Sequence, residues 1–317
     1  PGAVVCLPRG RRCGGEAAGM KVAVVAHAGK TVGGGLPELR RTLEDAGVAD
    51  PLWTEVPKSK RAPAAVEAAL GEGAELILAW GGDGMMRRCV NALEDTQVPL
   101  AIVPAGTSNI FATHLGIERD IGQAVEVALH GDRRRLDVGR FNGERFGVMA
   151  GAGFDAAMIK GADDLKDRLG RAAYVLGGAA KLNAPGFEAK IKIDGTRWYK
   201  GPASCILVGN LGGLFGGIEV FADARPDDGK LDVGVLTSEG PVKLVRAAAR
   251  TALGDARKSP FVRVTQGRKV RVKLDRKVRY ELDGGDRKKV KSFEVDVEPG
   301  AITVCVPSAA QNGNGAR

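Results

Sequence analysis

Residues 80–85 read Trp-Gly-Gly-Asp-Gly-Met, and they stand where an apolar run is expected to give way to a helix. The run 74–79 before them is typical of a buried strand, and residues 86–93 after them have the composition of a helix. Glycines at such a turn let backbone N–H groups approach an anion, and the start of a helix adds partial positive charge. The single carboxylate, Asp83, suits a hydrated Mg²⁺ that also binds phosphate oxygens. The stretch therefore predicts a nucleotide-phosphate site.

A second polar turn follows the next apolar run. Residues 100–103 read as a short strand, and they lead into Pro-Ala-Gly-Thr-Ser-Asn-Ile-Phe-Ala at 104–112. Gly106 opens the backbone there, and the hydroxyl and amide groups that follow it belong to Thr107, Ser108 and Asn109. Because ligands bind beyond the carboxyl ends of parallel strands, the two turns are expected to flank one crevice.

The first part of the chain, residues 20–136, alternates short apolar strands with helical segments. Repeated units of this kind predict a parallel, Rossmann-like sheet with helices on both faces. We expect strands at 21–26, 51–54, 74–79 and 100–103, and helices at 36–46, 63–71, after Gly84, after Asn109 and at 120–130. The pattern indicates an α/β nucleotide-binding domain.

After residue 136 the pattern changes to that of antiparallel strands. Asn142-Gly143 and Asp194-Gly195 each separate two strand-like segments, which is the sequence signature of a hairpin. Residues 262–282 and 293–306 alternate apolar and charged side chains, as strands with one wet face do. We therefore expect an antiparallel β-sandwich at 137–307, with a helical insert at 164–183. Residues 1–19 are expected to be a disordered leader or tag, and 308–317 a disordered tail.

Composition and cysteine usage exclude several classes of protein. Of the 317 residues, 44% are hydrophobic, which is enough for a real core, but no apolar run is long enough to span a bilayer. The five cysteines are scattered without a Cys-x-x-Cys pair, which argues against a disulfide framework or a structural zinc site and fits a reducing cytoplasm. Ala28-Gly29-Lys30-Thr31 imitates the end of a P-loop, but the first glycine of that motif is replaced by Val24, so a Walker-type NTPase is excluded.

Six segments of the chain together resemble the diacylglycerol kinase catalytic-domain family, which includes bacterial lipid kinases, sphingosine kinases and ceramide kinases. They are Gly-Gly-Asp-Gly-Met at 81–85, Pro-Ala-Gly-Thr-Ser-Asn-Ile-Phe-Ala at 104–112, Gly-Ala-Gly-Phe-Asp-Ala at 151–156, Asn-Leu-Gly-Gly at 210–213, Asp-Asp-Gly-Lys-Leu-Asp at 227–232 and Leu-Asp-Gly at 282–284. The resemblance covers nearly all of residues 20–307. It implies an active site in the cleft between the two domains, ATP and Mg²⁺ as cofactors, and transfer of the γ-phosphate to a lipid hydroxyl of diacylglycerol or a related alcohol.

The resemblance also implies roles for individual residues. The nucleotide-binding set is Gly81, Gly82, Asp83, Gly84, Met85, Gly106, Thr107, Asn109 and Thr54. The metal set is Asp228 first, with Asp227 and Asp232. Asp283, with Asp83 as a second candidate, is expected to receive or orient the proton of the acceptor hydroxyl. Each carboxylate also has a plainer interpretation, because Asp83 can cap a helix, Asp228 can lie in a solvated turn and Asp283 can form an Asp-Gly hairpin.

The chain departs from the family pattern at two positions. Met85 stands where the family usually has Thr, so a nucleotide contact there must come from the backbone amide. Gly285 stands where the family usually has the Glu that accepts the proton. The departures keep a non-catalytic, nucleotide-binding regulatory protein open as an alternative. NAD kinase, which shares the Gly-Gly-Asp-Gly turn but differs at the second motif, is the other alternative.

The net charge of +9 predicts an anionic partner. Because the resemblance implies a lipid substrate, we expect peripheral contact between a basic surface and the inner face of the membrane, from the cytoplasm, and no nucleic-acid partner. A role in phospholipid biosynthesis would follow. The sequence leaves a homodimer open.

Overall fold

The structure, a computed structural model, describes residues 19–48, 50–153, 186–214, 218, 219, 221, 223–237 and 262–308. It divides into two compact units. The first unit comprises Pro1–Gly106, Leu115–Arg135 and Ile302–Arg317, and the second comprises Thr107–His114 and Leu136–Ala301.

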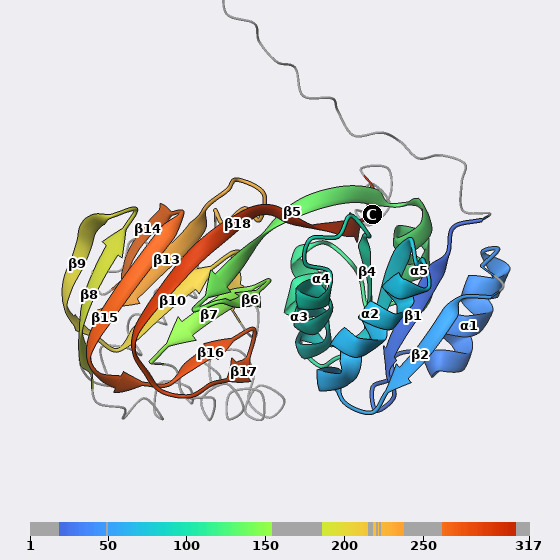
Figure 1. The fold of residues 1–317 in the computed structure, drawn as a ribbon, viewed down its shortest axis with the longest axis horizontal. Coiled ribbons are helices and arrows are strands. Elements are labelled where there is room, and N and C mark those ends of the chain that lie inside the picture. Colours follow the sequence, from blue (N-terminus) through green and yellow to red (C-terminus); the bar gives the residue numbers. More distant parts are fainter. Residues whose placement is uncertain are drawn as a thin grey trace, which may run out of the picture. The chain divides into compact units, whose positions relative to one another are not determined.

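The first unit is built on a parallel sheet with the strand order β2-β1-β3-β4 (Figure 1). These strands are β1 (Val22–His27), β2 (Leu52–Val56), β3 (Leu76–Gly81) and β4 (Leu100–Pro104). Every residue of β3 and β4 is buried, because helices cover both faces of the sheet. This confirms the Rossmann-like α/β arrangement that the sequence predicts.

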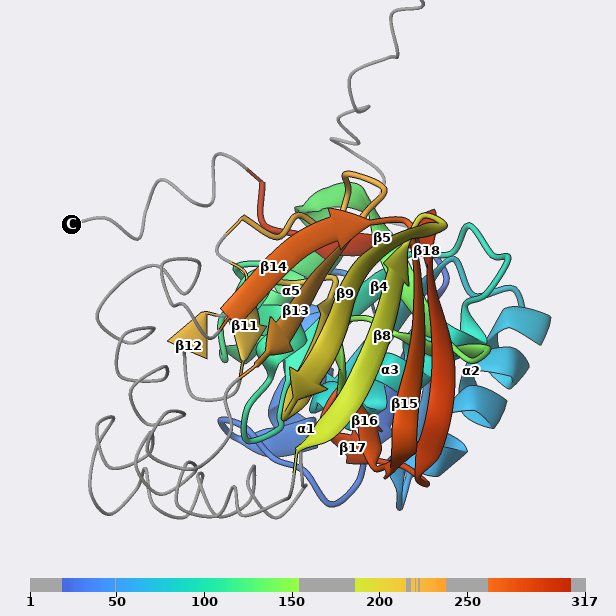
Figure 2. The same ribbon diagram turned by 90° about the vertical axis from the view of Figure 1, so that its left-hand side faces the viewer.

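Helices follow the strands as the sequence indicates. They are α1 (Gly35–Asp45), α2 (Ala62–Gly71), α3 (Asp83–Ala92), α4 (Ile110–His114) and α5 (Ile121–His130), with a 3₁₀ turn η1 (Ser59–Arg61) before α2. α2 packs against α3, and α1 packs against α5 (Figures 1 and 2). The Asp120 carboxylate caps α5 by accepting a hydrogen bond from the Gln123 amide at 2.8 Å.

The second unit contains three two-residue hairpins in which both turn residues have positive φ. The turns are Asn142-Gly143 between β5 (Asp132–Phe141) and β6 (Glu144–Phe146), Asp194-Gly195 between β8 (Phe187–Ile193) and β9 (Thr196–Ala203), and Asp283-Gly284 between β16 (Tyr280–Leu282) and β17 (Gly285–Asp286). Asn and Asp tolerate this left-handed conformation and Gly adopts it freely, so the turn twist matches that of the strands. The two predicted hairpins are confirmed.

Two sheets enclose the core of the second unit. One sheet has the order β14-β13-β10-β7-β16-β17, and the other ends in β18-β15-β8-β9 (Figure 2). The additional strands are β7 (Met149–Ala152), β10 (Cys205–Gly209), β13 (Leu231–Leu236), β14 (Val262–Gly267), β15 (Lys269–Val278) and β18 (Val290–Val306), and β11 (Gly213–Leu214) pairs with β12 (Ile218–Glu219). In the core, the Phe141 ring stacks on Tyr280 at 4.4 Å and on Phe293 at 4.5 Å between centroids.

Two segments lie across the predicted domain boundary. The end of β18, from Ile302 onward, belongs to the first unit, where Val304 pairs with Leu100 of β4 in parallel. Thr107–His114 belongs to the second unit, so the division falls inside the second glycine motif. The predicted insert 164–183, the leader 1–18 and residues 309–317 of the tail lie outside the described residues. In the described ranges, no helix combines the length and the apolar character needed to cross a bilayer.

Gly139 offers a test of the packing between β5 and β6. It lies opposite Phe146, and a Cβ at this position would run into the Phe146 ring, which is fully buried. We expect Gly139→Ala to lower the free energy of unfolding by about 1–3 kcal/mol, because the core has no room for the ring to move. Urea denaturation measures this.

The matched control is Gly71→Ala at the end of α2, where a Cβ would meet nothing within 4 Å. That variant is expected to be unchanged or up to about 1 kcal/mol more stable. Equal stability of the two variants would contradict the packing described for β5 and β6.

Candidate functional site

The first glycine turn joins β3 directly to α3. Gly81 is the last residue of β3, and a Cβ there would lie 2.7 Å from Cβ of Met85, so only glycine lets the helix start this close to the strand. Gly82 is the N-cap residue, and Asp83 occupies the first helical position. Gly84 is exposed, with only Ser59 Oγ within 4 Å of a Cβ built on it. The turn therefore offers exposed backbone and a helix N-terminus to an anion.

The second glycine motif begins beside the first. Gly81 pairs with Pro104, and the Ala105 amide donates to the Gly81 carbonyl at 2.9 Å. Asn109 adopts a positive φ of 49°, and its carbonyl accepts hydrogen bonds from the amide and the hydroxyl of Thr113, at 2.9 and 3.0 Å. Thr107 is exposed and Asn109 is buried. Residues 104–106 thus lie next to the first turn at the carboxyl edge of the sheet.

Two members of the predicted nucleotide set, Met85 and Thr54, differ from the others in their surroundings. The Met85 side chain is 1% exposed, and its amide donates to the Gly82 carbonyl at 2.8 Å. That amide is therefore used inside the first turn of α3, and a contact between it and the nucleotide stays a prediction. Thr54 is exposed on the edge strand β2, and β1 lies between it and β3. The sheet does not bring Thr54 next to the glycine turns.

The carboxylate of Asp283 holds the segment between β6 and β7. Its Oδ2 accepts a hydrogen bond from the Gly147 amide, and its Oδ1 accepts from the amides of Val148 and Met149, each at 2.9 Å. Both oxygens are therefore engaged with backbone donors. This geometry favours a positioning role for Asp283, which shapes the loop 147–149.

Asn210 connects this loop to a second carboxylate. Its Nδ2 donates to the carbonyls of Asp137 and Gly147, at 2.7 and 3.0 Å. The Asp137 carboxylate in turn accepts from the amides of Gly229 and Gly300, both at 2.7 Å. The turn around Gly229 and the loop held by Asp283 are thus parts of one hydrogen-bonded network. Asn210 is 1% exposed, and its Oδ1 has no hydrogen-bond partner among the described residues.

Two carboxylates of the predicted metal set, Asp228 and Asp232, accept hydrogen bonds from different partners. Asp228 Oδ1 accepts from the Lys230 amide at 2.9 Å, whereas Asp232 is buried and accepts from Gln266 Nε2 at 3.1 Å. Asp227 is exposed. No group of three or more His, Cys, Asp or Glu side chains in the described ranges is arranged to hold a metal ion. A common three-carboxylate site is therefore not formed, and a site with one carboxylate and carbonyl oxygens stays a prediction.

Glu281 is a titratable group that sequence reasoning missed. It lies on β16 opposite Gly151, is 4% exposed, and its Oε2 has no hydrogen-bond partner among the described residues. Burial first, and then the charges of Asp283 and Asp286, raise the pKa of Glu281 from 4.5 to about 7. Perturbed groups of this kind gather at functional sites. The only signal in the sequence was a Glu two residues before the Asp-Gly turn. The alternating pattern of that segment did not predict that the Glu281 side chain is buried.

Two family models match the chain. The diacylglycerol kinase catalytic domain matches residues 21–141, and the YegS C-terminal NAD kinase beta sandwich-like domain matches residues 148–306. The first match contains both glycine turns, and the second contains Asn210 and Asp283.

Similar proteins agree with these matches. The chain is 32% identical over 255 residues to a diacylglycerol kinase of Bacillus subtilis, which covers 78% of this chain and 83% of that protein. It is 35% identical over 178 residues to a probable lipid kinase YegS-like of Shewanella frigidimarina, a match that covers 54% of this chain and 57% of that one. A solved structure of a putative diacylglycerol kinase from Bacillus anthracis has the same fold, with a TM-score of 0.76 at 22% identity over 92% of this chain and 98% of that one. With both of its units matched, this chain belongs to the diacylglycerol kinase catalytic-domain family.

Proposed function

We propose that this protein is an ATP-dependent lipid kinase that transfers the γ-phosphate of ATP to the hydroxyl of diacylglycerol or a related lipid alcohol. The observation that carries the proposal is the adjacency of the two glycine turns at one sheet edge, in a chain whose family is that of kinases. Relatives named as diacylglycerol kinases or lipid kinases support the lipid acceptor.

The residues of the two glycine motifs fit the phosphates of a nucleotide. Gly84 leaves backbone exposed at the start of α3, Gly82 beside it is half-buried, and the helix adds positive potential there. Gly106 lies just beyond the strand that pairs with β3. Asp83 is the carboxylate that would hold Mg²⁺, which when bound neutralises phosphate charge and orients the transferring group. Thr107 and Asn109 continue the same motif and are proposed to contact the nucleotide.

The second unit is proposed to present the acceptor lipid. Asp283 fixes the loop 147–149 through three amide hydrogen bonds, so we assign it the orienting part of its predicted role. The family Glu is absent at Gly285. Phosphoryl transfer through a loose transition state depends mainly on positioning and charge neutralisation, so loss of that Glu is compatible with activity. Asp283 also stays the first choice to receive the hydroxyl proton, because the Asp83 carboxylate is the proposed Mg²⁺ ligand.

Two other functions make different predictions. NAD kinase would share the Gly-Gly-Asp-Gly turn, and its C-terminal domain is named in the second family model. It predicts formation of NADP from NAD and ATP. A non-catalytic regulatory protein predicts nucleotide binding without release of ADP. The second motif at 104–112 and the named relatives favour the lipid kinase over both.

Asp83→Asn tests the nucleotide site. The substitution removes the negative charge at the start of α3 but keeps the size of the side chain. We expect transfer of labelled phosphate from Mg²⁺-ATP to diacylglycerol in mixed micelles to fall by about a hundredfold or more, because charge stabilisation of the transferring group is lost.

Asp50→Asn, at an exposed loop position, is the matched control and should keep full activity. Full activity in Asp83→Asn would refute the assignment of the site. Formation of NADP by the unchanged protein, without lipid phosphorylation, would favour the NAD kinase alternative instead.

Glu281→Gln tests the buried carboxyl through stability. Because the folded-state pKa of Glu281 lies above 4.5, its contribution to stability is complete below about pH 4.5 and is lost as the pH rises through about 7. Gln stays neutral at every pH. We compare the free energy of unfolding of the variant with that of the unchanged protein. We expect this difference to be on the order of 3 kcal/mol more favourable to the variant at pH 8 than at acidic pH.

Urea midpoints at pH 5 and pH 8 measure this difference. Glu188→Gln, at an exposed position of β8, is the control and should show no such gain. If Glu281→Gln and the unchanged protein have parallel pH dependences, Glu281 is not a buried, protonated acid.

A further inference from the structure

A row of lysines crosses three strands on the exposed face of one sheet in the second unit. Lys190 of β8 lies directly opposite Lys200 of β9 on one side and Lys273 of β15 on the other. All three side chains are exposed. Like charges directly opposite one another in a sheet are destabilising. The fold therefore keeps an arrangement that costs stability, which calls for a partner that compensates it.

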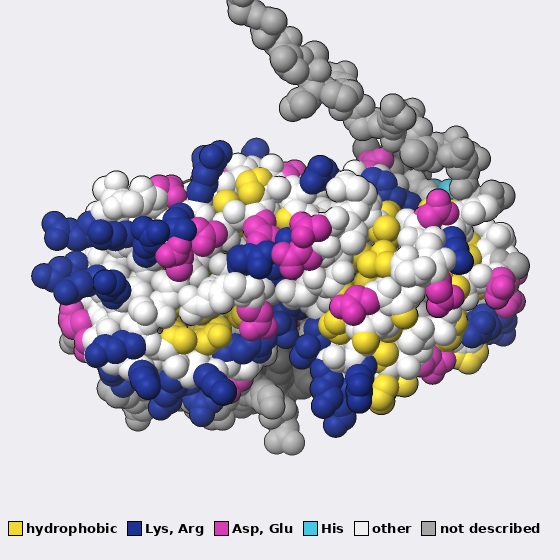
Figure 3. All heavy atoms as spheres, in the orientation of Figure 1, with side chains coloured by type: hydrophobic (Ala, Val, Ile, Leu, Met, Phe, Trp, Pro, Cys, Tyr) yellow, Lys and Arg dark blue, Asp and Glu magenta, His cyan; other side chains and the backbone are white. Residues whose placement is uncertain are grey.

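Two further basic residues extend the row. Arg197 of β9 lies opposite Lys192 of β8, and both are exposed. We call Lys190, Lys192, Arg197, Lys200 and Lys273 the basic face. In the space-filling view, Lys and Arg side chains gather at the left-hand end of the molecule, where Figure 1 places β8, β9 and β15 (Figure 3).

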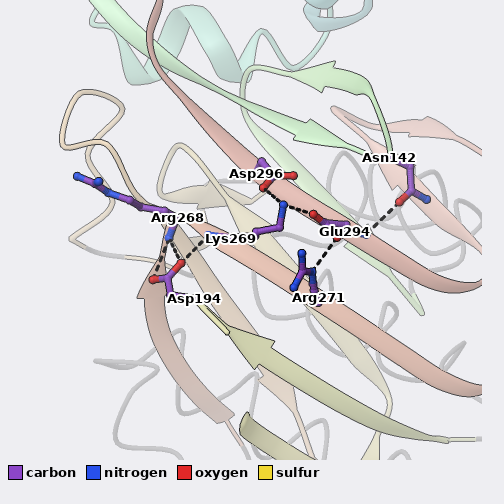
Figure 4. A network of polar contacts seen from close by, with 7 residues as sticks. All are labelled: Asn142, Asp194, Arg268, Lys269, Arg271, Glu294 and Asp296. Atoms are coloured by element: carbon purple, nitrogen blue, oxygen red, sulfur yellow. Dashed lines mark hydrogen bonds and ion pairs between the residues drawn. The ribbon is translucent and has the colours of Figure 1, made fainter. Parts of the chain in front are cut away.

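In the neighbouring part of the same sheet, by contrast, acidic side chains pair with the basic ones. Lys269 forms ion pairs with Glu294 and with Asp296, the latter at 2.8 Å, and Arg271 pairs with Glu294 at 2.9 Å (Figure 4). These acidic side chains come from β18, where each lies opposite its basic partner on β15.

The lysine row lacks this compensation. Lys273 faces Ser292 of β18 where its neighbours along β15 face acids. No salt bridge within the described part of the chain involves Lys190, Lys200 or Lys273. The exposed acids nearest along these strands are Glu188 and Asp275, two residues beyond Lys190 and Lys273. The positive charge is therefore concentrated on the middle of the face.

We propose that the basic face docks the protein on the anionic headgroups of a lipid bilayer. The proposal rests on the proposed function in one respect, since a lipid acceptor places the enzyme at a membrane. A lysine ammonium near an anionic bilayer contributes about 1 kcal/mol, so several on one sheet face add up to useful affinity. Single-stranded nucleic acid is favoured less, because the aromatic residues between Arg197 and Lys200, Trp198 and Tyr199, pack into the core of the second unit and leave bases no exposed ring to stack on.

The test is co-sedimentation with vesicles, without ATP and without any acceptor lipid. The probes are phosphatidylcholine vesicles with and without phosphatidylglycerol. The unchanged protein is expected to bind only the anionic vesicles. Lys190→Gln, Lys200→Gln and Lys273→Gln together are expected to weaken that partition by roughly tenfold to a hundredfold. High salt should have the same effect, since the screening length falls to about 3 Å at 1 M.

A matched control removes the same net charge elsewhere. Arg41, Lys58 and Lys60 are exposed in the first unit, and the triple change of these residues to Gln should bind anionic vesicles as the unchanged protein does. Thermal unfolding gives a second readout. The lysine-row variant should be at least as stable as the unchanged protein, because its substitutions relieve repulsion between facing charges.

Three results would overturn the proposal. The lysine-row variant binds as well as the control, both variants lose binding equally, or the lysine-row variant loses binding to a single-stranded oligonucleotide while it keeps binding to vesicles. Because no nucleotide or acceptor is present, these outcomes are separate from the kinase assay. A protein inactive as a kinase that still binds through the lysine row would refute the proposed function alone.

Discussion

The register between β3 and β4 is the constraint on which the nucleotide site depends. Parallel pairing sets Gly81 beside Pro104, and the Ala105 amide then donates to the Gly81 carbonyl. If β4 shifted by one residue, its buried side chains would turn toward the opposite faces of the sheet. Both strands are buried along their whole length, so the packing of their side chains fixes the register. Two loops separated in sequence thereby begin at one sheet edge.

The second unit is organised by polar side chains that bind backbone groups. Asp283, Asn210 and Asp137 satisfy amides and carbonyls of loops that form no sheet ladder. Buried backbone groups must find partners, so each of these side chains fixes the path of its loop. Glu281 is the exception, because one of its buried oxygens has no partner among the described residues. Burial and the nearby charges of Asp283 and Asp286 raise the pKa of this carboxyl to about 7, so it stays protonated in mildly acidic solution.

Charge on the sheet of β8, β9, β15 and β18 is arranged in two ways. At one end of β15, Lys269 and Arg271 each meet an acid of β18 across the strand pair. Toward β9, basic residues face basic residues. Composition showed only a net charge of +9, and it could not show where that charge remains uncompensated. Strand register decides this, because it sets which side chains become neighbours.

The sequence by itself determined the local structure of this protein. The apolar runs of the parallel strands and the Asn-Gly and Asp-Gly turns each act within a few residues. Their patterns therefore predicted the strands of the first unit to within two residues and the two hairpins at their turns. It also identified the family through its glycine turns.

Only the tertiary structure decided how distant residues are used. Asp283 binds the Gly147 amide across 136 positions of the chain, the end of β18 pairs with β4, and Met85 turns its amide into its own helix. Glu281 becomes a buried acid because of the strands around it. Local patterns carry no information on such contacts, since the free energy that selects them comes from packing and desolvation in the assembled fold.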